Sequence, residues 1–292
     1  MTKQDKHGGK IRIAAIQMAS GPMVNANLIE AERLISQSVK AGAGLVVLPE
    51  NFAIMGMSER DKVRLREQEG AGPMQEFLAE QARKHRIWLV GGTIPIQAND
   101  PDKVRAACLL FDDSGKQVAR YDKTHLFDVQ LVDHGGKQGE KYVESETIEA
   151  GDTVVVVDTP FARLGLAVCY DLRFPELFRN MLDLGVEIIA LPSAFTATTG
   201  KAHWETLVRA RAIENLSYLV AAGQGGYHVN GRESHGDSMI VDPWGNILDR
   251  LGSGSGFVIA EYDPANLERI RRNFPAISHR KLLCNINSAN KT

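Results

Sequence analysis

Residues 165–176 read GLAVCYDLRFPE, a stretch in which the pattern of the chain changes sharply. The apolar run that ends at Val168 predicts a buried strand, and Pro175 predicts the start of a helix. Cys169 therefore stands between a buried strand and a helix N-terminus, where backbone N–H groups and the helix dipole favour a thiolate. Most free cysteines are small buried hydrophobic residues instead. The local sequence alone therefore does not decide whether Cys169 is a nucleophile or a core residue.

Outward from this stretch, short apolar runs rich in β-branched residues alternate with segments of helical periodicity. Strands are predicted at 11–19, 45–49, 88–96, 106–111, 118–121, 154–158, 164–169, 187–192, 218–223, 238–242 and 257–262. Helices are predicted around 28–35 and at 74–85, 175–184, 203–216 and 264–273, with a long loop at 130–150. This order predicts one α/β domain of mixed sheets with helices on their outer faces.

Composition narrows the class of protein. The chain has 292 residues, of which 43% are hydrophobic, and Lys+Arg 34 against Asp+Glu 36 gives 34 − 36 = −2. A nucleic-acid or membrane-surface binder needs a basic excess, so neither partner is expected. Three cysteines are too few for a disulfide framework, and no run of 18 apolar residues could span a bilayer. The polar first ten residues do not resemble a signal peptide, so a cytoplasmic enzyme is expected.

Glu50 is the second candidate for a catalytic residue. Glu50 closes the run GLVVLPE at 44–50, so its carboxylate lies at the carboxyl end of a predicted strand. Active sites of open α/β sheets collect there, although a capping or ion-paired glutamate remains the alternative. Lys123 and Glu144 are ordinary exposed residues when each is taken alone.

Together, Glu50, Lys123 and Cys169 resemble the nitrilase superfamily of carbon–nitrogen hydrolases. The resemblance rests on LPENF at 48–52, YDKTHLFD at 121–128 and GLAVCYDLRFPE at 165–176, with further matches in PSAF at 192–195, AHWE at 202–205, RARAIEN at 209–215 and DPWG at 242–245. It implies a four-layer αββα sandwich over 10–275, a flexible segment at 1–9 and a C-terminal extension at 276–292. It also implies a homodimer or higher homo-oligomer and a second glutamate after the lysine, a place that Glu144 matches.

These residue types predict hydrolysis of an amide through a thioester. Cys169 is expected to attack the carbonyl as a thiolate, while Glu50 takes the thiol proton and later delivers it to the leaving nitrogen. Lys123 is expected to stabilise the oxyanion, and Glu144 to position Lys123 or the substrate amide. The neighbouring ammonium would let the cysteine ionise near neutral pH.

The run TTGKAHWE at 198–205 and the Asp-Val pair at 128–129 are most similar to the branch of deaminated-glutathione amidases. That branch cleaves the amide between a 2-oxoglutaryl group and cysteinylglycine. Arg173 could bind the acyl carboxylate, and Tyr170, Phe195 and Thr199 are expected to line the same pocket. An ω-amidase, a nitrilase, an N-carbamoyl amidase and a non-catalytic binding protein on the same fold remain alternatives.

Other catalytic constellations fit poorly. The run GSGSG at 252–256 is no nucleophile elbow, because its central residue is a glycine and it lies in a small-residue turn and not at a strand-to-helix junction. The histidines lack metal-ligand spacing, and no glycine-rich segment forms a phosphate loop or dinucleotide fingerprint. No metal and no cofactor are therefore expected, and the predicted partner is a small-molecule amide.

Overall fold

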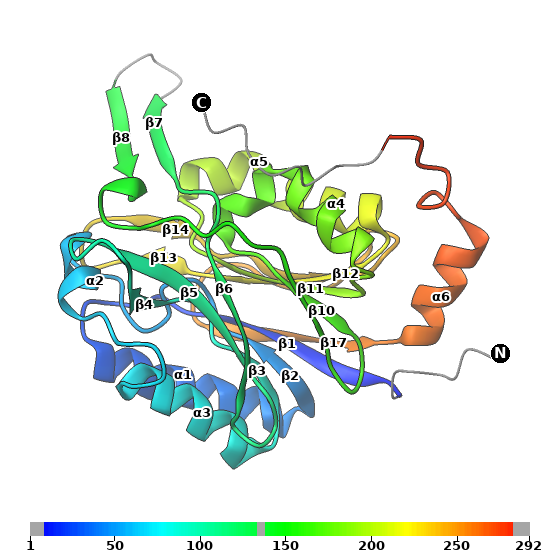
Figure 1. Cartoon of the computed structure of the whole chain (residues 1–292), viewed down its shortest axis with the longest axis horizontal. Helices are drawn as coiled ribbons and strands as arrows, with labels where there is room; N and C mark the ends of the chain where they lie inside the picture. The colour runs from blue at the N-terminus through cyan, green and yellow to red at the C-terminus, as the bar shows by residue number, and fades with distance from the viewer. Residues whose placement is uncertain (1–8, 133–137, 283–292) are drawn as a thin grey trace.

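The computed structural model describes residues 9–132 and 138–282. Two mixed β-sheets pack face to face, with helices on the outer face of each sheet (Figure 1). The four-layer αββα sandwich predicted from the sequence is thus confirmed. The helices within residues 9–132 and 138–282 are all too short or too polar to span a lipid bilayer.

The first sheet has seven strands. They are β17 (Gly256–Tyr262), β1 (Ile11–Gln17), β2 (Ala43–Val47), β3 (Trp88–Val90), β5 (Val104–Phe111), β4 (Ile94–Gln97) and β6 (Gln117–Asp122). Strands β1, β2 and β3 run parallel, whereas β17, β5 and β6 pair antiparallel with their neighbours. Both β3 and β4 pair with the same edge of β5, so they are two halves of one interrupted strand.

The second sheet has six strands in the order β16 (Ile247–Leu251), β15 (Ser238–Val241), β12 (Tyr218–Gly223), β11 (Ile188–Ser193), β10 (Arg163–Leu166) and β9 (Val155–Asp158). The central strands β10, β11 and β12 run parallel, and the outer pairs are antiparallel. The carboxyl ends of parallel strands lie at one edge of a sheet, which is where α/β proteins build their sites.

Helices complete the layers. The helices α1 (Val24–Lys40) and α3 (Pro73–His85) cover the first sheet, and α4 (Pro175–Asp183) and α5 (Ala197–Asn215) cover the second (Figure 1). The remaining elements are α2 (Arg60–Arg64), α6 (Pro264–Asn273), the 3-10 turns η1 (Glu144–Glu146) and η2 (Cys169–Arg173), and the pairs β7 (Asp128–Val132) with β8 (Gln138–Val143) and β13 (Gly225–Tyr227) with β14 (Glu233–His235).

The core follows the two-residue period of the strands. Ile13 and Leu45 point between the two sheets, whereas Ile16 and Val46 join the cluster under α1 and α3. Successive side chains of a strand point to opposite faces, so a strand covered on both faces reads as a continuous apolar run. That is why the central strands were predictable from short apolar runs.

Several predicted elements need correction. The long loop predicted at 130–150 is wrong, because the structure places β7, β8 and η1 there; residues 133–137 lie outside the described residues. Helix α5 begins at Ala197 and not at 203, since Thr196 caps it by accepting a hydrogen bond from the Thr199 N–H. The strand predicted at 88–96 is interrupted between β3 and β4, and the short strands β13, β14 and β16 were not predicted.

Candidate active site

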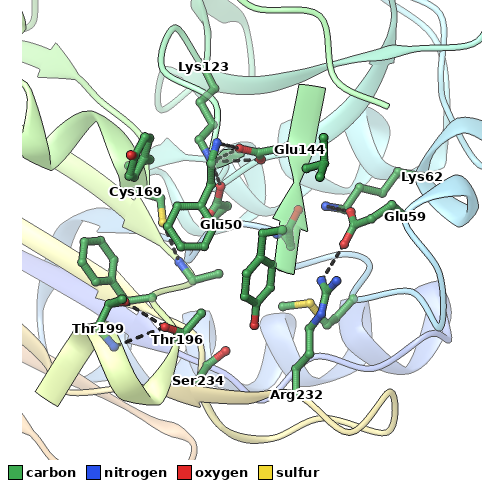
Figure 2. Close-up of a pocket in the computed structure, with 18 of the residues that line it drawn as sticks. Glu50, Glu59, Lys62, Lys123, Glu144, Cys169, Thr196, Thr199, Arg232 and Ser234 are labelled. Atoms are coloured by element: carbon green, nitrogen blue, oxygen red, sulfur yellow. Dashed lines mark hydrogen bonds and ion pairs between the residues drawn. The ribbon is translucent and has the colours of Figure 1, made fainter. Parts of the chain in front are cut away.

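Four polar side chains from four separate segments meet at one end of the sandwich. Glu50 follows β2, Lys123 follows β6, Glu144 opens η1 and Cys169 opens η2. They line a cavity of about 340 Å³ (Figure 2). Glu50, Lys123 and Cys169 are buried, and Glu144 keeps 13% of its side chain exposed. The structure therefore brings together the four residues predicted to act in catalysis.

The Lys123 ammonium group lies between two carboxylates. Its Nζ donates hydrogen bonds to Glu50 Oε1 at 2.8 Å and to the Glu144 carboxylate at 2.9 Å. Burial alone would lower the pKa of Lys123, but the charges of Glu144 and Glu50 outweigh it and raise that pKa well above its ordinary value. Lys123 is therefore a cation at every physiological pH. Glu144 is fixed in turn by the Phe127 N–H, which donates to its Oε2 at 2.7 Å.

Cys169 lies in a sharp turn. Its φ is +48°, a left-handed conformation that is strained for a residue with a Cβ. The Ala194 N–H donates to its Sγ at 3.4 Å. Burial and the Glu50 carboxylate raise the pKa of the thiol well above its ordinary value, although Lys123 and the Ala194 N–H oppose the shift. The direction of this shift opposes the predicted ionisation near neutral pH, and the Glu50 carboxylate that faces the thiol is placed to accept its proton.

A fully buried carboxylate, Asp171, joins the segments that carry Lys123 and Cys169. It accepts hydrogen bonds from the Tyr121 hydroxyl at 2.7 Å, the Val168 N–H at 2.8 Å and the His125 N–H at 3.1 Å. His125 Nδ1 also lies 2.7 Å from Asp171 Oδ1. The sequence pattern assigns Asp171 no role, because its hydrogen-bond partner Tyr121 lies 50 residues away in the chain.

The backbone around Glu50 is held by neighbouring segments. The Asn51 N–H donates to Thr93 Oγ1 at 2.9 Å, and the Glu50 carbonyl accepts from Gln224 Nε2 at 3.0 Å. Thr93 lies in the interruption between β3 and β4, where Gly92 has a φ of +58°. A Cβ on Gly92 would lie 2.1 Å from the Pro49 carbonyl oxygen. The interruption thus lets two backbones approach closely enough to position Glu50.

The four residues predicted to bind substrate also line the cavity. The Arg173 guanidinium carbon lies 5.5 Å from the centre of the Phe195 ring and 5.8 Å from that of Tyr170. Thr199 is buried in the first turn of α5. Arg173 is half-buried and makes no ion pair within the described ranges 9–132 and 138–282, although its Nη1 lies 3.3 Å from His203 Nδ1. Its charge is available to an anionic ligand.

A charged cluster on the cavity wall was missed. Glu59 and Lys62 lie in or beside α2, and Arg232 approaches from the β13–β14 hairpin (Figure 2). The spacing of Glu59 and Lys62 by three residues is a helical ion-pair signal that could have drawn attention to them. Arg232 gave no signal, because it lies 173 residues from Glu59 in the chain.

Neither Cys108 nor the turn at 252–255 lines the cavity. Over the part of the chain that the structure describes, no group of three or more His, Cys, Asp or Glu side chains could hold a metal ion. Cys108 is buried in β5, and burial raises the pKa of its thiol far above the ordinary range, so it is an inert core residue. Residues 252–255 form a turn between β16 and β17 and not a nucleophile elbow.

The chain is similar to known proteins along most of its length. The chain is 42% identical over 270 residues to the deaminated glutathione amidase of Synechocystis sp., covering 91% of this chain and 97% of that protein. It is 37% identical over 272 residues to the Homo sapiens deaminated glutathione amidase, covering 92% and 82% of the two chains. The crystal structure of the Caenorhabditis elegans NitFhit protein superposes with a TM-score of 0.88 at 37% identity, covering 98% of this chain and 69% of that one. Residues 12–272 match the sequence profile of carbon-nitrogen hydrolases, the family to which this chain belongs.

Proposed function

We propose that this carbon–nitrogen hydrolase is an amidase that cleaves a linear amide through a thioester on Cys169. One observation carries the proposal: a buried thiol, a carboxylate and an ammonium held by two carboxylates meet in a single cavity. A structural role for these groups would not require a cavity beside them. A buried ion cluster is costly to desolvate, and that cost is expected where the cluster performs chemistry.

The first half-reaction begins from a neutral thiol. Glu50 accepts the Cys169 proton while the sulfur attacks the carbonyl carbon, so no free thiolate need accumulate. The carbonyl oxygen becomes an oxyanion, which the Lys123 ammonium and the Tyr170 N–H stabilise. The intermediate then collapses, the C–N bond breaks, and Glu50 delivers its proton to the leaving nitrogen. An amine departs and the acyl group stays on sulfur.

The second half-reaction reverses these roles. Glu50 removes a proton from water as the water attacks the thioester carbonyl, and Lys123 stabilises the second oxyanion. When the C–S bond breaks, Glu50 returns the proton to Cys169, and the carboxylic acid is released. Glu144 supports both steps by accepting a hydrogen bond from the Lys123 ammonium beside Glu50, so it acts as a positioning residue.

We propose deaminated glutathione as the substrate, with 2-oxoglutarate and cysteinylglycine as products. The relatives named above support this choice, since two of them carry the name of that activity. The cavity supports it also, because Arg173 offers its guanidinium to an acyl carboxylate beside the nucleophile turn.

A substrate panel tests the proposal. Deaminated glutathione, 2-oxoglutaramate, a simple nitrile and an N-carbamoyl amino acid would be compared by kcat/KM. The proposal predicts the highest value for deaminated glutathione. A higher value for 2-oxoglutaramate would make the protein an ω-amidase, and activity only on the nitrile or carbamoyl compound would contradict the amidase assignment. No turnover of any compound would favour a binding protein.

We also propose a homodimer or higher homo-oligomer. Exposed apolar side chains of Ile213, Trp244 and Phe274 support self-association, and Trp244 and Phe274 contact each other with ring centroids 5.5 Å apart. Sedimentation analysis of Trp244→Ala tests this: weaker association than in the wild type is expected. A monomeric wild type would contradict it.

A further inference from the structure

The cavity wall away from Cys169 carries a second charged cluster. Figure 2 shows Glu59, Lys62 and Arg232 on one side of the cavity, with Cys169 and Thr199 on the other side. Lys62 Nζ lies 3.1 Å from Glu59 Oε2, and Arg232 Nη1 lies 2.5 Å from Glu59 Oε1. The three residues line the same cavity as the nucleophile.

This cluster has more positive than negative charge. Lys62 and Arg232 share the single carboxylate of Glu59, and the two cations keep the pKa of that carboxyl at about 2 against the effect of burial. Glu59 is therefore ionised, and the cluster has a net charge of +1. Only 10% of the Lys62 side chain is exposed, so water compensates its charge poorly. A second anion would balance the cluster.

The cluster is also held in place. Arg232 lies over the ring of Tyr142, with its guanidinium carbon 5.0 Å from the ring centre. Asn230 Nδ2 donates to the Gly56 carbonyl at 2.8 Å, and the Arg232 N–H donates to Asn230 Oδ1 at 3.1 Å. These bonds fix the β13–β14 hairpin against the segment before α2. The exposed charges of Lys141, Glu146 and Glu233 also line the cavity, but solvent screens them.

We propose that Lys62 and Arg232 bind a carboxylate carried by the leaving amine of the substrate. The inference rests on the proposed function and divides the cavity by charge: Arg173 takes the acyl carboxylate, and the Lys62–Arg232 pair takes the carboxylate across the scissile bond. With that carboxylate bound, two cations face two anions and the cluster becomes neutral. The amine product would therefore be an amino acid or a small peptide and not a neutral amine.

The experiment compares two substrates that differ only at the leaving group. One is deaminated glutathione, and the other carries a carboxamide in place of the glycine carboxylate. The wild type should prefer the acid by about 30-fold in kcat/KM. Lys62→Met and Arg232→Gln should each lower this ratio by about tenfold. Because both substrates meet the same enzyme preparation, a partly misfolded variant does not change the ratio.

Arg64→Met is the matched control for Lys62→Met. Arg64 lies on the same helix, pairs with Asp61 and is 74% exposed, and it does not line the cavity. Its ratio should equal that of the wild type. A wild-type ratio near one, or ratios unchanged in both cluster variants, would overturn the inference and leave the amidase proposal standing. If the wild type cleaves neither compound, the proposed function fails and the inference with it.

Discussion

The residues of the site explain how a poorly ionised cysteine can act as a nucleophile. Burial and the Glu50 carboxylate raise the pKa of the Cys169 thiol, while Lys123 lies between two carboxylates that raise its pKa against the effect of burial. The proton acceptor is therefore in place before substrate arrives, and the ammonium is in place before the oxyanion forms. Such preorganisation avoids reorganising charge during the reaction.

Glu50→Gln should lower the pKa of the Cys169 thiol. The substitution removes a carboxylate that raises this pKa and keeps Lys123, which lowers it. The pH profile of alkylation by iodoacetamide should therefore shift toward lower pH, so that the variant reacts faster than the wild type at pH 7. Turnover should fall by about 100-fold or more, because the general base is lost. Cys169→Ser supplies the background rate. An unshifted or alkaline-shifted profile would contradict the assignment of Glu50.

Arg173→Ala should discriminate between amides by their acyl groups. Loss of a charge-assisted contact should lower kcat/KM for a substrate with an acyl carboxylate by about 30- to 1,000-fold, or about 2–4 kcal/mol. A neutral short-chain amide makes no such contact, so its kcat/KM should change little. Equal losses on both amides would show that Arg173 is structural.

The catalytic side chains lie on segments that follow strands, and hydrogen bonds between these segments hold them in place. Glu50 and Cys169 were predictable because each follows an apolar strand. The hydrogen bonds that hold these residues in place were not predictable from the sequence. Thr93 lies 42 residues from its partner Asn51, and Asp171 lies 50 and 46 residues from Tyr121 and His125. The sequence of 130–150 gives no strand signal, because β7 and β8 form a separate two-stranded sheet and lack the apolar run of a core strand.

Asp171→Asn should reduce the free energy of unfolding by about 2–4 kcal/mol, because a buried charged acceptor of several hydrogen bonds is lost. Urea denaturation measures the change. Asp158→Asn is the matched control: Asp158 pairs with Arg163 at the surface, with 69% of its side chain exposed, and should cost less than about 1 kcal/mol. Similar small losses in both variants would show that Asp171 does not hold the two segments together.

Gly92→Ala should both destabilise the fold and impair catalysis. The added Cβ meets the Pro49 carbonyl oxygen directly before Glu50, so the backbone must move; we expect a loss above about 3 kcal/mol and a reduced kcat. Gly70→Ala measures the cost of placing a Cβ on a residue with positive φ in the absence of a clash, since Gly70 also has a positive φ but open space around it. That control should cost about 1 kcal/mol with no effect on kcat. Equal losses in the two variants would contradict the proposed close approach.

For the molecule as a whole, the two sheets make the site possible. Parallel strands from both sheets direct their carboxyl ends to the same edge of the sandwich, so β2 supplies Glu50 and β10 supplies Cys169 across the interface between sheets. The layers were predictable because strands covered on both faces read as apolar runs. The Glu59, Lys62 and Arg232 cluster was not, because only the folded sheets bring α2 and the β13–β14 hairpin to one cavity.

Cys169 is proposed to carry the acyl group of deaminated glutathione. The most direct measurement is the release of the primary amine of cysteinylglycine by the wild type and by Cys169→Ser, with the fold of each checked by thermal unfolding. We expect turnover by the wild type, and less than about one-thousandth of it in the variant at an unchanged Tm, since a serine hydroxyl is a far weaker nucleophile beside Glu50. Activity in Cys169→Ser within tenfold of the wild type would show that Cys169 is not the nucleophile.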